Sequence, residues 1–288
     1  MVWLIHPTTV AAEELPPLRD GGLGGGAAPT HYRAAGLAGR IASDLQAQLS
    51  FPIGLAWQRP STFLLGTAGL AALIASDPVI YNAMASPLVT SHRNVVGPAQ
   101  TVSRFGDGTV AIPLILGFGV AGLIAGSERE KRTGVMLTEA VVTSAVWTGL
   151  IKYAAGRERP RELHEAGSDW TGPGGAFDDE SGPVPHLSFP SGHATGAWAT
   201  ATILAHQYPR GYLVPAIAYG SAAAVSYSRM IVGAHWLSDV VVGGLIGYGC
   251  ARQVISAHEP NTDTQASRFH FTIDPIGDQR GAGMAVDF

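Results

Sequence analysis

Apolar residues gather in six segments of the chain, and more polar stretches of very different length separate them. The segments are 62–76, 109–126, 134–151, 194–205, 212–227 and 240–254. Ala, Gly and Leu dominate them and no alternation with a period of two is sustained, so the pattern predicts helices. A further, amphipathic helix is predicted over 32–49, where apolar residues recur at helical spacing, at Leu37, Ile41, Leu45 and Leu49.

The two ends of the chain differ from this helical region. Residues 1–30 predict a disordered N-terminal segment, and no complete signal peptide is expected there because His6 and Pro7 interrupt its apolar run. Residues 31–258 are predicted to form one helical domain. In the tail, 259–288, apolar and polar residues alternate in two short runs, at Phe269, Phe271 and Ile273 and at Met284, Val286 and Phe288. The sequence therefore predicts an all-α bundle of about six core helices, with a small C-terminal β-hairpin.

The composition favours contact with a membrane. Hydrophobic residues make up 46% of the chain and charged residues 14%, whereas soluble domains carry about 25% charged residues. A helix needs about 20 apolar residues to span a bilayer. The segments 109–126 and 134–151 come near this length, while 194–205 and 240–254 are shorter. A membrane protein with six spans and a soluble periplasmic bundle both remain open.

Charge placement orients the chain if its helices span the membrane. Arg129, Lys131 and Arg132 lie between the second and third apolar segments, and loops rich in Lys and Arg stay on the cytoplasmic side. The loops after the first, third and fifth segments would then face outward. We therefore expect a cell-envelope protein whose active site faces the periplasm. A net charge of −4 gives no reason to expect nucleic acid as a partner.

Three groups of polar residues lie at the ends of apolar segments. In the first group, Lys152 is followed after six residues by Arg159-Pro160. The second group is Pro190-Ser191-Gly192-His193. In the third group, Ser228-Arg229 is followed after five residues by His235 and after three more by Asp239. Arginine and lysine bind the non-bridging oxygens of phosphate, and the start of a helix favours an anion. His235 and Asp239, four residues apart, share a helix face, so the carboxylate can fix the imidazole tautomer. Each group alone is weak evidence, but together they indicate phosphoryl transfer.

In order and spacing, the three groups resemble the signature of the type 2 phosphatidic acid phosphatase superfamily. This superfamily also holds bacterial acid phosphatases and vanadium-dependent haloperoxidases. The resemblance covers about 105–252, including Phe105-Gly106-Asp107-Gly108. It implies a helical bundle with the active site at one end. It also implies a phosphatase without metal or other cofactor, which hydrolyses a lipid phosphate, another phosphomonoester or a pyrophosphate through a phosphohistidine.

The resemblance also assigns roles to residues of this chain. His235 would be the nucleophile, Asp239 its orienting partner, and His193 first the acid and then the base. The phosphate-binding residues would be Lys152, Arg159, Ser191, Gly192 and Arg229.

Two other functions stay open at this point. A vanadium-dependent haloperoxidase would hold vanadate with the same residues, although the chain is short for the usual halide-site scaffold. A non-catalytic membrane protein would keep the anion pocket, although both histidines and the aspartate are present. The segment 161–189 predicts either a lid that shapes substrate choice or a solvated loop. Glu139, inside an apolar segment, is expected to make a hydrogen bond within the protein.

Overall fold

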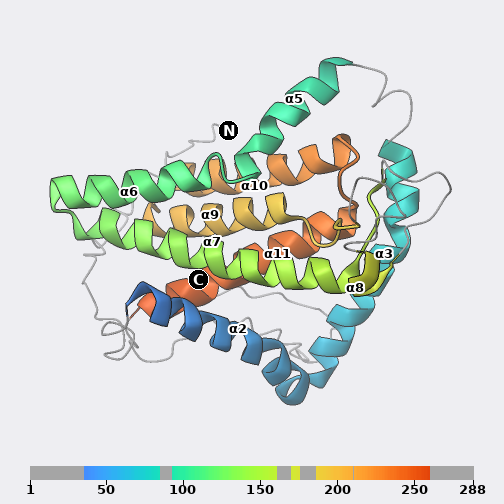
Figure 1. The fold of residues 1–288 in the computed structure, drawn as a ribbon, viewed down its shortest axis with the longest axis horizontal. Coiled ribbons are helices and arrows are strands. Elements are labelled where there is room, and N and C mark those ends of the chain that lie inside the picture. The colour runs from blue at the N-terminus through green and yellow to red at the C-terminus, as the bar shows by residue number, and fades with distance from the viewer. Residues whose placement is uncertain (1–35, 85–92, 161–169, 176–185, 210, 260–288) are drawn as a thin grey trace, which may run out of the picture.

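The chain folds into a helical bundle (Figure 1). The computed structural model describes residues 36–84, 93–160, 170–175, 186–209 and 211–259. The helices are α2 (Leu37–Gln58), α3 (Pro60–Met84), α5 (Arg93–Ser103), the 3₁₀ turn η1 (Arg104–Gly106), α6 (Ala111–Ala125), α7 (Glu128–Ala155), α8 (Gly172–Gly175), α9 (Gly192–Gln207), α10 (Leu213–Ile231) and α11 (Leu237–His258). Within those ranges there is no β-strand, so the all-α prediction is confirmed. The predicted hairpin and the predicted disordered segment 1–30 lie outside the described residues.

Each of the six apolar segments lies in a helix, but some boundaries differ from the prediction. The first segment is part of a much longer helix, because α3 continues through Pro78 to Met84. The sequence pattern also missed α5, whose residues form no apolar run. This helix packs against α10, so tertiary contact stabilises a segment whose composition does not predict a buried helix.

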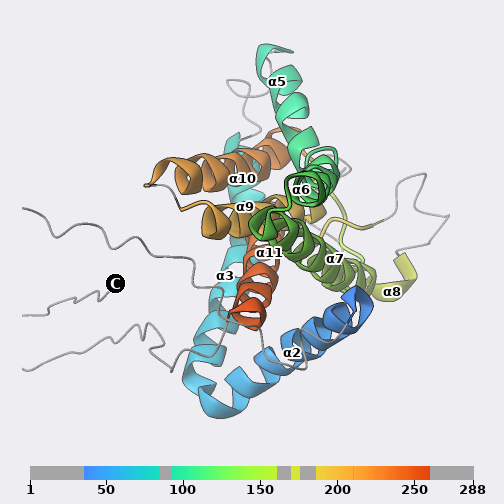
Figure 2. The same cartoon turned by 90° about the vertical axis from the view of Figure 1, so that its left-hand side faces the viewer.

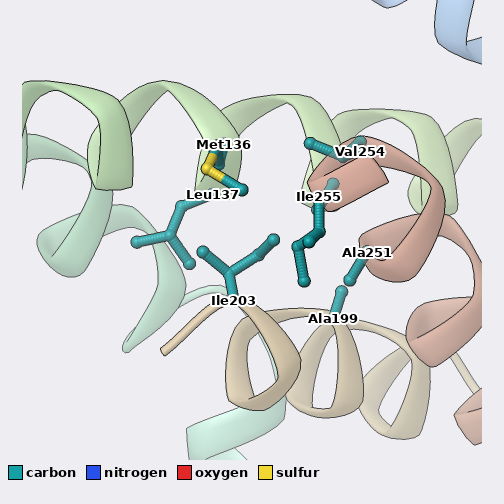
Figure 3. Close-up of a cluster of buried hydrophobic side chains, with 8 residues drawn as sticks. Met136, Leu137, Ala199, Ile203, Ala251, Val254 and Ile255 are labelled. Carbon is teal, nitrogen blue, oxygen red and sulfur yellow. The ribbon is translucent and has the colours of Figure 1, made fainter. Parts of the chain in front are cut away.

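The centre of the bundle is formed by α7, α9 and α11 (Figure 2). Their buried apolar side chains meet in one cluster, which includes Met136, Leu137, Ala199, Ile203, Ala251, Val254 and Ile255 (Figure 3). Two glycines let α11 approach α9 closely. A Cβ atom at Gly247 would collide with the carbonyl oxygen of Thr195, and one at Gly243 with that of Ser191. This close packing fixes the beginning of α9 against the first turns of α11.

The polar face of α2 packs against the bundle, and its apolar face is turned outward. Arg40 Nε lies 2.5 Å from the Glu139 carboxylate of α7, and Gln48 donates to Thr143 Oγ1 at 3.1 Å. The His258 ring nitrogen also contacts Glu139, at 2.5 Å, so the hydrogen bond expected for this glutamate is present. The exposed apolar side chains of α2 are Leu37, Leu49, Phe51, Ile53 and Trp57. The predicted amphipathic helix therefore exists, but only part of its predicted apolar stripe faces the bundle: Ile41 and Leu45 are half-buried, whereas Leu37 and Leu49 are exposed.

Among the described residues, three helices are long and apolar enough to cross a membrane. They are α3, α7 and α11, and the pair Val95–Gly106 and Ala111–Ala125, bent by 43°, would add a fourth if it forms one span. The sequence pattern made the last apolar segment look short because only twelve residues lie between Asp239 and Arg252. The helix instead runs through both residues, and Asp239 is buried inside the protein. The α3 helix exposes Leu64 and Leu65 on a surface that suits lipid.

Candidate active site

The three predicted groups of polar residues meet at one end of the bundle. The C-terminal ends of α7 and α10 and the N-terminal ends of α9 and α11 lie together there (Figure 1, right). Lys152, Arg159 and Arg229 are all close enough to His193 to act on it electrostatically. Lys152 and Arg229 act in the same way on His235. The fold therefore brings together residues that are separated by more than 80 positions in the sequence.

His235 and Asp239 form a buried pair at the beginning of α11. His235 Nδ1 lies 3.4 Å from Asp239 Oδ2, and neither side chain is accessible to more than a trace of solvent. A carboxylate in this position accepts the Nδ1 proton, so the other ring nitrogen, Nε2, keeps its lone pair. The pair has the geometry that the four-residue spacing predicted.

Three further donors hold the Asp239 carboxylate in place. Arg157 Nη1 donates to Oδ1 at 2.7 Å, Ser188 Oγ donates to Oδ2 at 2.5 Å, and the Trp236 N–H donates to Oδ2 at 2.9 Å. Neither Arg157 nor Ser188 was predicted from the sequence as a site residue. Arg157 lies inside the first motif, two residues before Arg159, which is a signal that could have drawn attention to it. Ser188 belongs to the segment 161–189, so this segment contributes to the site.

The Lys152 side chain lies against the beginning of α9. Its Nζ donates to the carbonyl oxygen of Leu187 at 2.6 Å, and its Cε is 3.9 Å from the place of a Cβ on Gly192. Ser191 is the N-cap of α9, with Oγ accepting from the Ala194 N–H at 3.4 Å. The first N–H groups of a helix have no partner within it and favour an anion. Lys152 and the start of α9 therefore form one side of an anion site.

His193 lies in the first turn of α9, where η1 packs closely against it. A Cβ atom at Gly106 would lie 2.7 Å from the His193 carbonyl oxygen and equally close to Val225, so only glycine fits between them. Asp107, in the same segment, acts electrostatically on His193. The Phe105-Gly106-Asp107-Gly108 segment noted in the sequence is thus a neighbour of this histidine.

The surroundings of both histidines lower their pKa and favour the neutral imidazole. Burial and the nearby Arg229 lower the pKa of His193 to about 4. Burial also lowers the pKa of His235 to about 4, although the hydrogen bond with Asp239 opposes this effect. A neutral imidazole with a free lone pair is able to act as a nucleophile.

A groove with a volume of ≈ 310 Å³ begins beside Lys152 and Gly192. Its walls come from η1, α6, α7 and α9. The lining is mostly apolar and includes Phe105, Ala111, Val141, Ala145, Gly149 and Gly196. The groove thus joins the cationic site to an apolar surface within the bundle. Within the described ranges, no three His, Cys, Asp or Glu side chains gather into a group that could hold a metal ion.

Comparison with known proteins identifies the family. The family model of the PAP2 superfamily matches residues 133–263. A lipid A 1-phosphatase from Rhizobium etli is 31% identical over 204 residues, which cover 67% of this chain and 81% of that protein. The chain belongs to the PAP2 superfamily. An undecaprenyl-diphosphatase from Sulfolobus acidocaldarius is 30% identical over 146 residues, which cover 51% of this chain and 62% of that protein.

The PAP2 fold is also visible in a solved structure. A transmembrane PAP2-type phosphatidylglycerolphosphate phosphatase from Bacillus subtilis matches with a TM-score of 0.50 and 22% identity, over 69% of this chain and 94% of that chain. The superfamily that the three motifs indicated is therefore confirmed, and the chain is a PAP2-type phosphatase, a phosphoric ester hydrolase. Three of the described helices also have the length and apolar composition that a membrane span needs. Neither a haloperoxidase nor a non-catalytic anion-binding protein gains support from the matches.

Proposed function

We propose that this PAP2 phosphatase removes phosphate from a membrane lipid through a phosphohistidine on His235, without a metal ion. The buried His235–Asp239 pair carries the proposal, because its free ring nitrogen lies in a site with Lys152 and Arg229. Cations of this kind bind the charged oxygens of the phosphate and keep them in place while the nucleophile attacks.

The proposed reaction has two steps. In the first, His235 Nε2 attacks phosphorus, and the bond to the leaving oxygen breaks as His193 donates a proton to that oxygen. Asp239 stabilises the positive charge on the phosphorylated imidazole. In the second step, His193 takes a proton from a water molecule that attacks phosphorus, which releases phosphate and restores neutral His235. Lys152, Arg159, Arg229 and the first N–H groups of α9 hold the non-bridging oxygens in both steps.

The phosphate itself prepares His193 for its role as an acid. Its pKa is low partly because of the positive charge of Arg229. A bound phosphate dianion offsets this charge and raises the pKa of His193. His193 therefore gains its proton in the complex with substrate, where the leaving oxygen needs it.

The groove beside Lys152 favours a lipid over a soluble phosphomonoester. It starts at the phosphate site and continues over apolar side chains of η1, α6 and α7. Relatives of the chain include a lipid A 1-phosphatase and an undecaprenyl-diphosphatase, both of which act on lipid substrates. We therefore assign the groove to the part of the hydrocarbon tail nearest the phosphate.

We place the active site on the periplasmic side of the membrane. The 28-residue helix α7 carries Arg129, Lys131 and Arg132 in its first turns and Lys152 near its other end. At 1.5 Å per residue this helix is about 42 Å long, enough to cross the bilayer. If the basic end lies in the cytoplasm, the catalytic end lies in the periplasm.

Phosphate release should survive EDTA and should be inhibited by vanadate. Three cationic side chains already neutralise the phosphate, and vanadate can occupy the same site as a mimic of five-coordinate phosphorus. The measurement is phosphate release from phosphatidic acid, phosphatidylglycerophosphate, a polyprenyl pyrophosphate, lipid A and nitrophenyl phosphate, with and without detergent. A loss of activity in EDTA that Mg²⁺ or Zn²⁺ restores would contradict the proposal.

Gly149→Leu should raise KM for long-chain substrates about tenfold while the kinetics with nitrophenyl phosphate stay unchanged. Gly149 lines the groove, and a Cβ atom there meets nothing within 4 Å, so leucine can occupy space assigned to the tail. Excluding two methylene groups is enough for an effect of about this size. The matched control is Gly249→Leu, which also has open space around its Cβ but lies outside the groove. Equal losses with both substrates would reject the groove assignment.

A further inference from the structure

Arg157 is a fully buried cation placed between two fully buried carboxylates. Its Nη1 donates to Asp239 Oδ1 at 2.7 Å, and its Nη2 donates to Asp77 Oδ2 at 2.8 Å. All three side chains are at 0% exposure. Charges so far from water interact strongly, because the medium around them screens them poorly.

Asp77 reaches this cluster from α3, which carries none of the superfamily motifs. Its Oδ1 accepts the Ser238 N–H at 2.9 Å, and its Oδ2 accepts the Ser238 hydroxyl. Arg157 Nη1 also donates to Ser238 Oγ, at 2.7 Å. Asp77 is thereby tied both to Arg157 and to the residue that immediately precedes Asp239.

Two tryptophan rings lie close to the guanidinium of Arg157. It lies 4.6 Å from the ring centre of Trp170 and 5.1 Å from that of Trp236. The carbonyl oxygen of Arg157 accepts the N–H of Ser188 at 2.8 Å, and the Ser188 hydroxyl in turn donates to Asp239. The position of Arg157 therefore determines two of the donors that surround the Asp239 carboxylate.

We propose that Asp77 and Arg157 are positioning residues. Together with Asp239, they set the net negative charge that lies beside the His235 ring and stabilises its cationic form. The inference rests on the proposed function in taking His235 as the nucleophile. Arg157 by itself would neutralise Asp239 and leave it unable to stabilise an imidazolium. Asp77 balances Arg157, so the cluster of two carboxylates and one guanidinium presents one net negative charge to His235.

Other charged residues also face His235, and none of them is substituted in the test. Lys152 of α7 and Arg229 of α10 act on it directly, together with Asp239 of α11. His193 of α9 shares Lys152 and Arg229 as neighbours. Substitutions of Asp77 and Arg157 leave all of these side chains unchanged. A difference in the His235 titration between variants is therefore due to the Asp77–Arg157 pair.

The test is a pH titration of the His235 ring, monitored by NMR on protein labelled with ¹³C in its histidines. The quantity compared between variants is the pH at the midpoint of this titration. Asp77→Asn removes a negative charge, so the midpoint should fall by about one unit or more. Arg157→Gln removes a positive charge, so the midpoint should rise by a similar amount. The double variant restores the net charge and should return the midpoint to within a few tenths of a unit of wild type. In parallel, kcat for nitrophenyl phosphate should fall about tenfold in each single variant, recover partly in the double variant, and leave KM nearly unchanged.

The matched control is Glu139→Gln. Glu139 is another fully buried carboxylate with an arginine partner, Arg40, and it lies about 20 Å along α7 from Lys152. This variant should lose stability without moving the His235 midpoint. Shifts in the same direction for Asp77→Asn and Arg157→Gln, or an equal shift in Glu139→Gln, would overturn the inference.

If Arg157→Gln does not fold, Arg157→Lys keeps the charge and should keep the midpoint, whereas Asp77→Asn should still lower it. A midpoint that stays in place in Asp77→Asn would then overturn the inference. If wild type releases no phosphate from any substrate, the proposed function fails, while the titration still tests the charge balance around His235.

Discussion

His235→Ala is expected to abolish turnover and covalent labelling together, with kcat reduced by on the order of 10⁵- to 10⁶-fold. The imidazole forms the N–P bond, and its neighbours Lys152 and Arg229 cannot take over as nucleophiles while they hold phosphate as cations. The measurement is rapid-quench labelling with radioactive nitrophenyl phosphate. An alkaline quench preserves the acid-labile phosphohistidine, and peptide mapping then places the label.

His193→Ala is the informative contrast to this variant. Nitrophenolate is a good leaving group that needs little help from an acid, so the first step should still proceed with this substrate. Hydrolysis of the intermediate should then stall, because no base activates water. The label should accumulate on His235 in a burst without steady turnover. Label on His193, or undiminished label in His235→Ala, would contradict the assignment of the two histidines.

Asp239→Asn should lower kcat by about 10⁴-fold while the protein stays folded. In the structure, Oδ2 accepts from Ser188, Trp236 and the His235 ring, and Oδ1 accepts from Arg157. An amide NH₂ in either place would face a donor, so the imidazole would be driven toward the wrong tautomer and its cation would lose its counter-charge. Steady-state kinetics and thermal unfolding measured on the same preparation separate the two effects.

Ser188→Ala provides the matched comparison for this prediction. It removes one neutral donor from the same oxygen atom but leaves the negative charge of Asp239 intact. Its loss of kcat should therefore be smaller, about tenfold to a hundredfold. Activity of Asp239→Asn within tenfold of wild type would show that the carboxylate is not needed to support the imidazolium.

The sequence was sufficient to predict the superfamily and the grouping of the polar residues, because these residues lie in three short motifs with fixed spacings. His235 and Asp239 illustrate this, since a separation of four residues at the start of a helix determines their contact. Asp77 could not be found in this way. It lies 80 residues before Arg157, and no local pattern links positions so far apart. An acidic residue at the end of an apolar segment was the one available signal, and it names no partner.

The orientation of α2 shows a second limit of the sequence pattern. Its periodicity identified a helix with two unlike faces, but periodicity alone does not say which face points inward. In water the apolar face would be buried. The face that packs against α7 and α11 carries Arg40, Asp44 and Gln48, and a lipid surrounding would solvate Leu49, Phe51 and Trp57, which remain exposed.

The polar face of α2 also has a consequence for biosynthesis. Gln48 donates to Gln253 at 3.0 Å, and Gln253 donates to Asp44 at 3.2 Å, so residues of α2 pair with a helix made more than 200 residues later. As the ribosome releases the chain, α2 emerges long before α11, and a helix with unsatisfied polar groups does not settle in hydrocarbon. If the helices cross a membrane, we expect α2 to stay at its surface until α7 and α11 are inserted. Joining α2 to these helices would then be a late assembly step, after the proposed catalytic residues His193, His235 and Asp239 have all been synthesised.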